Sequence, residues 1–65
     1  MDEHKKKAIE DLIKIRETGK FNMFMDRRNI LQYANSNNLF HLVSYCGNDM
    51  SKYKELLDED WSEIE

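Results

Sequence analysis

The chain has 65 residues, and its length, composition and charge limit what it can be. A chain this short forms one domain, buries only about 60% of the surface that its unfolded form exposes, and has a marginal core. Thirteen Asp or Glu residues against ten Lys or Arg give a net charge of −3, which disfavours nucleic-acid binding as the main activity. No stretch reaches the roughly 18 to 20 apolar residues of a membrane span, and no apolar signal core follows the charged start. We therefore expect a cytoplasmic protein with no membrane partner.

The composition predicts an all-α protein. Proline is absent, glycine occurs twice, and charged residues make up 35% of the chain beside 40% hydrophobic residues. From Lys5 to Arg16 the apolar residues recur at intervals of three and four, the pattern of an amphipathic helix. Gly19 follows at the position where a left-handed residue commonly ends a helix. We expect a compact bundle of three to four short helices that dimerises.

A second helix is expected after the first turn. Asp26 can accept hydrogen bonds from the free amides at the start of this helix, whose apolar residues occur at positions 30, 31 and 34. The run Asn-Ser-Asn-Asn at 35 to 38 ends it. Asparagine tolerates the left-handed conformation, so Asn37 or Asn38 should take the place of a cap glycine.

The third predicted helix is short and very apolar, runs from Leu39 to Cys46 and stops at Gly47. We expect it to lie in the core, with Cys46, the single cysteine, as a buried and reduced thiol. A fourth helix should start between residues 48 and 51 and fray beyond Leu57. Residues 1–65 thus form a single helical domain, with a core of about 5–57 and an acidic C-terminal extension at 58–65.

Charge is uneven along the chain. Residues 1–34 hold eight Lys or Arg against six Asp or Glu, whereas residues 35–65 hold two against seven, and six carboxylates fall within the last eleven residues. These acidic residues form either a solvated helix face or a docking surface for a basic groove. Trp61 beside them either packs on the core or anchors an interface. The candidate partner-binding residues are Glu55, Asp58, Glu59, Asp60, Trp61 and Glu63.

A competing hypothesis assigns phosphate contacts to the basic residues. The candidates are Lys5, Lys6, Lys7, Arg27 and Arg28. The second and third helices could form a helix-turn-helix, but the helix offered to the groove would lack the Arg, Lys, Asn or Gln residues that read bases. Three lysines at a helix start are more typical of a solubilising surface.

The sequence contains no motif of a catalytic, metal or cofactor site. His4, His41 and Cys46 have neither the spacing of a zinc site nor that of a nucleophile and its base. Asp11 and Glu17 are expected to be ordinary surface carboxylates. We therefore expect a protein that is not an enzyme and that binds no metal or cofactor.

The turn after the first helix is rich in large apolar residues. We expect the Asn22 side chain to bond the local backbone, with Met23 and Phe24 plugging the core. The apolar residues here and on the third helix exceed what a small core easily hides, so we expect a symmetric homodimer that buries part of them. The core or dimer candidates are Phe21, Met23, Phe24, Met25 and Phe40.

The chain resembles a small helical family carried by phages and prophages of Gram-positive bacteria. The family pattern has an Ile-Arg pair, Thr or Ser with Gly, then Asn-Met-Phe, an aspartate, a helix with an alanine, and a Leu-Val-x-Tyr-like helix. The matching residues lie between Ile9 and Leu57 and include Arg16, Thr18, Gly19, Asn22, Met23, Phe24, Ala34, Leu42, Val43, Tyr45 and Tyr53. The chain departs from the pattern at Met25, which looks like an insertion, at Asn38, where glycine is usual, and after Leu57.

The resemblance implies a phage origin and a helical fold, but no activity. Small phage proteins commonly act by binding. The leading hypothesis is therefore a protein that binds and inhibits or redirects a host protein, such as a nucleic-acid-handling or defence enzyme, in the bacterial cytoplasm. The alternatives are a small dimeric DNA-binding or transcription-regulatory protein, and an assembly accessory that binds only itself.

Overall fold

The fold consists of helices joined by short turns, in a computed structural model that describes residues 2–47 and 49–64, the side chain of Glu63 excepted. Within this part of the chain, α1 spans Glu3–Glu17, α2 spans Arg27–Ser36, α3 spans Phe40–Cys46 and α4 spans Met50–Leu57, and a 3₁₀ turn, η1, follows at Trp61–Glu63. The predicted all-α bundle is confirmed. Dimerisation stays a prediction.

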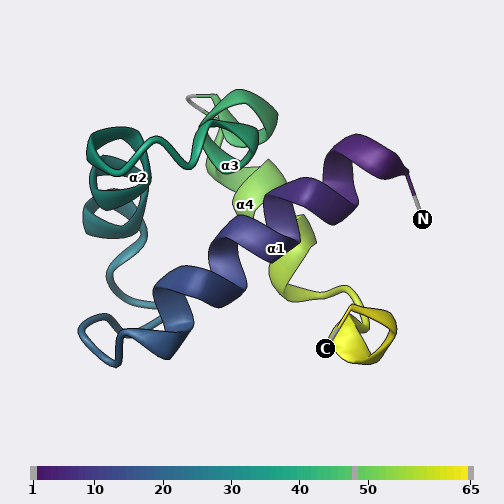
Figure 1. Ribbon diagram of the computed structural model, residues 1–65, viewed down its shortest axis with the longest axis horizontal. Helices are drawn as coiled ribbons and strands as arrows, with labels where there is room; N and C mark the ends of the chain where they lie inside the picture. Colours follow the sequence, from purple (N-terminus) through teal and green to yellow (C-terminus); the bar gives the residue numbers. More distant parts are fainter. Residues whose placement is uncertain (1, 48, 65) are drawn as a thin grey trace.

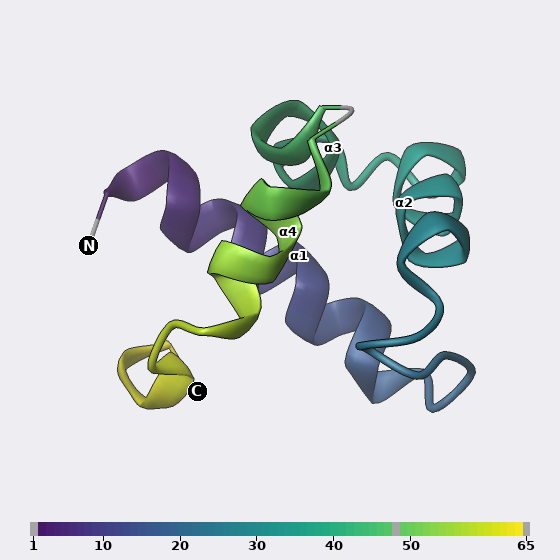
Figure 2. The same ribbon diagram turned by 180° about the vertical axis from the view of Figure 1, so that it is seen from behind.

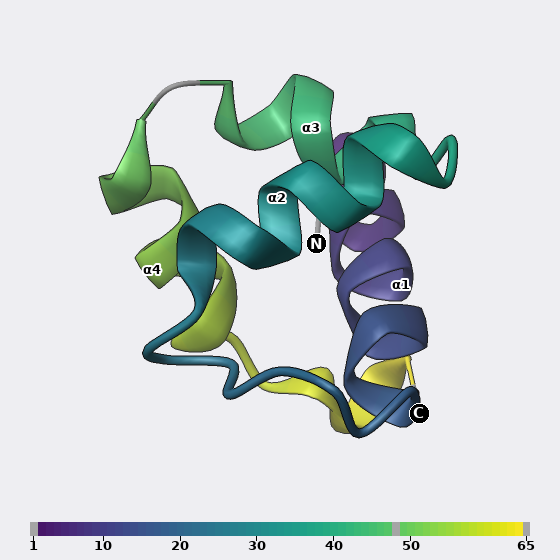
Figure 3. The same ribbon diagram turned by 90° about the vertical axis from the view of Figure 1, so that its left-hand side faces the viewer.

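The long helix α1 organises the bundle. It crosses the molecule in front of α4 in Figure 1 and behind it in Figure 2, with α2 and α3 along one side. Turned by 90°, Figure 3 shows α3 above α2, with α1 and α4 on either side. The most extensive packing between helices joins α1 to α3.

Each of the four helices supplies side chains to one core. The apolar residues whose spacing predicts an amphipathic α1 are largely the residues that the helix buries. Full burial of one such aliphatic side chain contributes about 1.5–3 kcal/mol to stability. The buried apolar residues are Ala8, Ile9, Leu12, Ile15, Ile30, Ala34, Leu42, Cys46, Tyr53 and Leu56. The third predicted helix therefore contributes to the core as expected, although it shares that role with the others.

The C-terminal ends of α1, α2 and α3 follow the local signals in the sequence. Gly19 has a positive φ of 68° after α1, and Gly47 one of 55° after α3. Asn38 has a φ of 62°, and the next amide, that of Leu39, donates to the carbonyl of Ala34 at 2.8 Å. This bond pattern is that of a Schellman cap, so Asn38 takes the role usually given to glycine.

Candidate interaction surface

Two of the acidic candidates are tied to the start of α1. The Lys5 ammonium lies 2.9 Å from a Glu55 carboxylate oxygen and 2.6 Å from one of Glu59. These hydrogen bonds raise the pKa of Lys5, first through Glu59 and then Glu55, and the Lys5 side chain in turn lowers the pKa of Glu55. Lys5 therefore fastens the end of α4 and the residues after it to α1.

The next acidic candidates face solvent. Asp58 and Asp60 are exposed, and Asp60 also accepts a hydrogen bond from the amide of Ser62 at 3.0 Å, which begins η1 and lowers the pKa of Asp60. The side chain of Glu63 and all of Glu65 lie outside the described residues. Asp58 and Asp60 are thus the acidic candidates that the structure leaves open to a partner.

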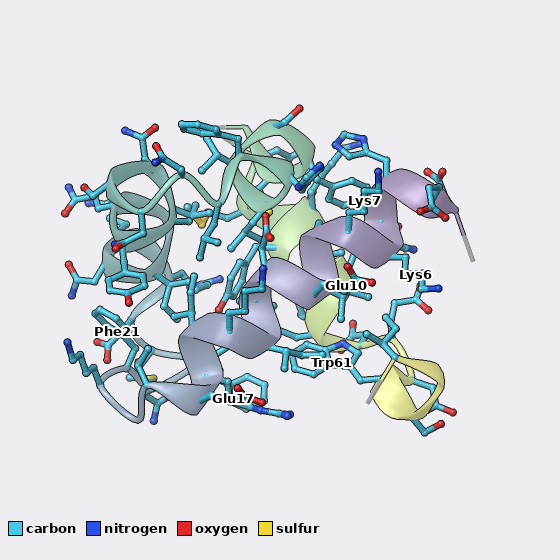
Figure 4. The ribbon with its side chains drawn as sticks, in the orientation of Figure 1. Lys6, Lys7, Glu10, Glu17, Phe21 and Trp61 are labelled. Atoms are coloured by element: carbon cyan, nitrogen blue, oxygen red, sulfur yellow. The ribbon has the colours of Figure 1, made fainter. Side chains whose placement is uncertain are left out.

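Trp61 lies against the molecule rather than projecting from it. Its indole Nε1 donates to the carbonyl of Leu56 at 2.8 Å, and the Arg16 guanidinium carbon sits 5.3 Å from the ring centroid. Figure 4 shows the side chain extending from the 3₁₀ turn toward α1. The ring is half-buried, so it both packs on the fold and retains an accessible portion.

The accessible portion of Trp61 lines a surface groove, which we call the Trp61 groove. Its other lining residues are Arg16, Met23, Phe24 and Leu57. The groove brings together Trp61 from the C-terminal segment and the turn before α2, two regions that the sequence alone does not connect.

The turn before α2 is built by side-chain hydrogen bonds to its own backbone. Asn22 Oδ1 accepts from the amides of Phe24 at 2.9 Å and Met25 at 3.0 Å, which confirms the predicted role of Asn22. Met23 is half-buried, and its carbonyl accepts from the Tyr53 hydroxyl at 2.6 Å. These bonds fix the turn as a rigid corner.

The prediction that Phe24 plugs the core is wrong. Phe24 is 69% exposed and Met25 is 80% exposed. The Tyr53 hydroxyl binds the Met23 carbonyl, and Asn22 Oδ1 binds the amides of the next two residues. With the backbone in this position, the side chains of Phe24 and Met25 lie in solvent. Apolar character alone does not tell which residue of a tight turn enters the core.

Asp26 does not cap α2 as expected. Its Oδ2 accepts from the amide of Asn22 at 2.8 Å, and α2 begins without a side-chain cap. Asn22 and Asp26 thus brace the turn from both ends.

The remaining apolar candidates divide between packing and exposure. Phe21 packs edge-to-face on Tyr33, with 5.4 Å between ring centroids. Phe40, on the helix expected to lie in the core, is 53% exposed, because the residues that α3 buries in the core are Leu42 and Cys46. A dimer interface over the exposed residues stays a prediction.

The basic candidates do not form one patch. Lys5 is engaged by two carboxylates, and Lys6 and Lys7 are exposed at the start of α1 (Figure 4). Arg27 and Arg28 are exposed on α2, which lies on the left of Figure 1, whereas the start of α1 lies on the right. The exposed side chains of α3 are Phe40, His41 and Ser44, and none of them is an Arg, Lys, Asn or Gln, the residues that make bidentate contacts with guanine or adenine.

The expectation that Asp11 is a surface carboxylate is wrong. Asp11 is only 5% exposed, and its Oδ2 accepts a hydrogen bond from the Leu42 amide, near the start of α3, at 3.1 Å. His41 Nδ1 lies 3.7 Å from the same oxygen. The helix α3 has Leu39 at its N-cap and no side-chain cap of its own, so Asp11 supplies the missing acceptor.

The nucleophile and metal-ligand residue types are dispersed. Cys46 is buried, as predicted, and burial raises the pKa of its thiol to about 11, so the thiol stays protonated at neutral pH. His4 contacts the Tyr45 ring edge-to-face at 5.3 Å. Across residues 2–47 and 49–64, no three His, Cys, Asp or Glu residues gather as a metal site would require. No helix in this part is both long and apolar enough to cross a bilayer.

Comparison with known proteins adds no relative. No protein-family model matches the chain, and no curated protein or solved structure is similar to it.

Proposed function

We propose that this protein is a non-enzymatic interaction module that binds a basic surface of a host protein and inhibits or redirects that protein by occupying the surface. The observation that supports this proposal is the Trp61 groove, in which the exposed Phe24 and the half-buried Trp61 line the same hollow. Aromatic side chains at the centre of an interface commonly carry much of the binding energy.

The charge beside the groove favours a basic partner. Asp58 and Asp60 are exposed, and they lie in the chain between two of its lining residues, Leu57 and Trp61. Arg16, the cation in the groove lining, lies over the Trp61 ring. A partner with an apolar pocket edged by Lys or Arg would complement this arrangement.

The acidic candidates divide into two roles under this proposal. Glu55 and Glu59 hold the C-terminal segment on α1 through Lys5, whereas Asp58 and Asp60 meet the partner. The resemblance to a phage family supports a host protein as the target. A homodimer is compatible with the proposal, and stays a prediction.

Phe24→Ala and the double variant Asp58→Asn/Asp60→Asn test the proposal. Phe24 is 69% exposed, so its truncation leaves the core intact. Asparagine is a good N-cap, so Asp60→Asn keeps an acceptor for the Ser62 amide. Both variants should therefore fold with wild-type helicity.

Tagged wild-type protein, the two variants and an exposed-site control, Lys20→Gln, would each be incubated with nuclease-treated lysate of a Gram-positive host. The expected result is a host protein that wild type and Lys20→Gln retain and both test variants lose. Calorimetry with the purified partner should then show an affinity loss of about tenfold or more for each variant, as for groups at the centre of an interface. Equal recovery by wild type and both variants would overturn the proposal.

A further inference from the structure

A second groove runs along α2, where this helix faces the junction of α3 and α4. Two adjoining hollows share Arg28 and Met50 and together form what we call the α2 groove. The remaining lining residues are Met25, Asp26, Arg27 and Asn29 in one hollow and Leu31, Gln32, Asn35, Val43 and Gly47 in the other.

Four of the eleven residues that line the α2 groove have apolar side chains. Leu31, Val43 and Met50 are half-buried, and Met25 at one end is 80% exposed. Methionine is flexible and polarisable, so two methionines allow a surface to fit side chains of different shapes. The groove therefore suits an apolar ligand face.

The charge of the α2 groove is positive. Arg27 and Arg28 are exposed, and neither forms an ion pair within the described residues. Asp26 is the acidic residue of the lining, and its carboxylate faces the Asn22 amide at 2.8 Å. This basic groove stands on a chain whose net charge is −3, so its sign is opposite to that of the molecule.

We propose that the α2 groove binds an acidic amphipathic segment of a partner protein. Apolar side chains of the segment would pack on Met25, Met50 and Leu31, and one of its carboxylates would pair with Arg28. Arg is the residue best suited to bidentate pairing with a carboxylate. The lining also holds Asn29, Gln32 and Asn35, whose amides are of the kind that reads bases. Two arginines offer few phosphate contacts, however, so an apolar segment with carboxylates fits the groove better than nucleic acid.

This surface is separate from the one in the proposed function. Phe24 lines the Trp61 groove and Met25 lines the α2 groove, so the turn that Asn22 builds divides two grooves that share no lining residue. Failure of either proposal leaves the other intact, since each has its own lining residues and variants.

Methionine methyl resonances provide a direct test. Protein with ¹³C-labelled methionine methyl groups would be titrated with a synthetic 14-residue helical peptide that has leucines on one face and glutamates elsewhere. The matched peptide carries lysine in place of each glutamate. The expected result is a shift of the Met25 and Met50 methyl resonances with the glutamate peptide and none with the lysine peptide, while Met23, which packs on the core, stays unchanged.

Charge reversal of Arg28 provides the second arm. Arg28→Glu should weaken binding of the glutamate peptide by about tenfold or more. A glutamate in the first turn of α2 interacts favourably with the helix dipole, so the variant should not lose stability. Lys7→Glu, in the first turns of α1, changes the net charge by the same amount and is the control. This variant should bind the glutamate peptide as wild type does.

Several results would overturn the proposal. They are the absence of a methyl shift with the glutamate peptide, an equal shift with the lysine peptide, and unaltered binding by Arg28→Glu. If a 16-base-pair DNA duplex shifts the same methyl resonances and binds more tightly than the glutamate peptide, the groove would be assigned to nucleic acid instead. Shifts that follow protein concentration without peptide would assign it to a second copy of this chain.

Discussion

The carboxylate of Asp11 in α1 accepts a hydrogen bond from the amide of Leu42 in α3, 31 residues further along the chain. Helix α3 has seven residues and begins at a leucine N-cap, so it has no acceptor of its own at this end. One side chain of α1 thus satisfies a backbone amide of α3 within the closest helix pair of the bundle.

Asp11→Ala is expected to destabilise the protein. The substitution leaves the buried Leu42 amide without an acceptor, at a cost of about 1–3 kcal/mol in the free energy of unfolding. Urea unfolding followed by circular dichroism measures this cost. Asp11→Asn keeps an oxygen acceptor and should lose less, and Glu10→Ala, at an exposed neighbour, should change stability by less than about 0.5 kcal/mol. Equal stability of Asp11→Ala and Glu10→Ala would contradict the capping role.

Gly19→Val is expected to lower stability through the backbone alone. Gly19 has a φ of 68°, and an added Cβ would meet no atom within 4 Å, so steric contact with the rest of the fold is not involved. A branched side chain in this conformation costs roughly 1–2 kcal/mol. Thermal unfolding should show a lower midpoint for valine and a smaller change for Gly19→Asn, because asparagine tolerates the left-handed region. A valine variant as stable as wild type would remove the argument for a left-handed cap.

Alkaline pH should destabilise the fold through Tyr53. Burial raises the pKa of Tyr53 from 10.0 to about 12, so the folded state retains the phenol proton that the unfolded state loses first. The resulting stability is fully present below pH 10 and is lost as pH rises toward 12. Cys46, whose pKa burial raises from 9.0 to about 11, acts in the same direction over a lower range.

Tyr53→Phe separates the contribution of Tyr53 to alkaline destabilisation from that of Cys46. The variant loses the hydrogen bond to the Met23 carbonyl, which costs about 1 kcal/mol at neutral pH. Its urea midpoint should then fall less steeply than that of wild type between pH 10 and 12. Parallel pH profiles for the two proteins would show that Tyr53 does not carry the alkaline transition.

Lys5→Met should loosen the segment after α4. Lys5 is only 15% exposed at its side chain and pairs with both Glu55 and Glu59, and methionine keeps the stem while removing the charge. Acrylamide should then quench Trp61 fluorescence more strongly than in wild type, with α-helical content retained. Lys6→Met, at an exposed neighbour, provides the control. Identical quenching in both variants and wild type would mean that the ion pairs do not hold Trp61 in place.

The parts of the fold that depend on nearby residues are predictable from the sequence. Gly19, Asn38 and Gly47 follow the ends of helices as expected, because their positive φ angles depend on the residue and its immediate neighbours. The amphipathic spacing of α1 likewise predicts its buried side. These signals need no knowledge of the rest of the chain.

Long-range roles are harder to predict, and Asp11 shows why. Its cap on α3 exists only once α1 and α3 have packed. Two signals nevertheless point to it: Asp11 falls on the same helix face as Ala8, Leu12 and Ile15, and α3 has no capping residue at its start. A carboxylate in an apolar stripe and a helix without a cap together predict such a pair.

The Trp61 groove depends on similar long-range packing. The hydrogen bond of Trp61 to Leu56 is local, but its neighbours Arg16 and Phe24 come from the far half of the sequence. Sequence patterns identify the acidic residues and the tryptophan but not the aromatic partner across the groove. The direction in which Phe24 points is set by Tyr53 and Asn22 together.

The reactivity of the buried Cys46 thiol reports opening of the hydrophobic core. The side chain is 2% exposed and holds its proton, so a thiol reagent can react at an appreciable rate only when the core separates. Trp61, at the edge of the fold, also becomes exposed when the C-terminal segment is released while the core stays closed. Thiol labelling would therefore report opening of the core, and tryptophan quenching in the same sample would report release of the C-terminal segment. A bound partner that reduces the quenching without slowing the labelling would be located at the C-terminal segment.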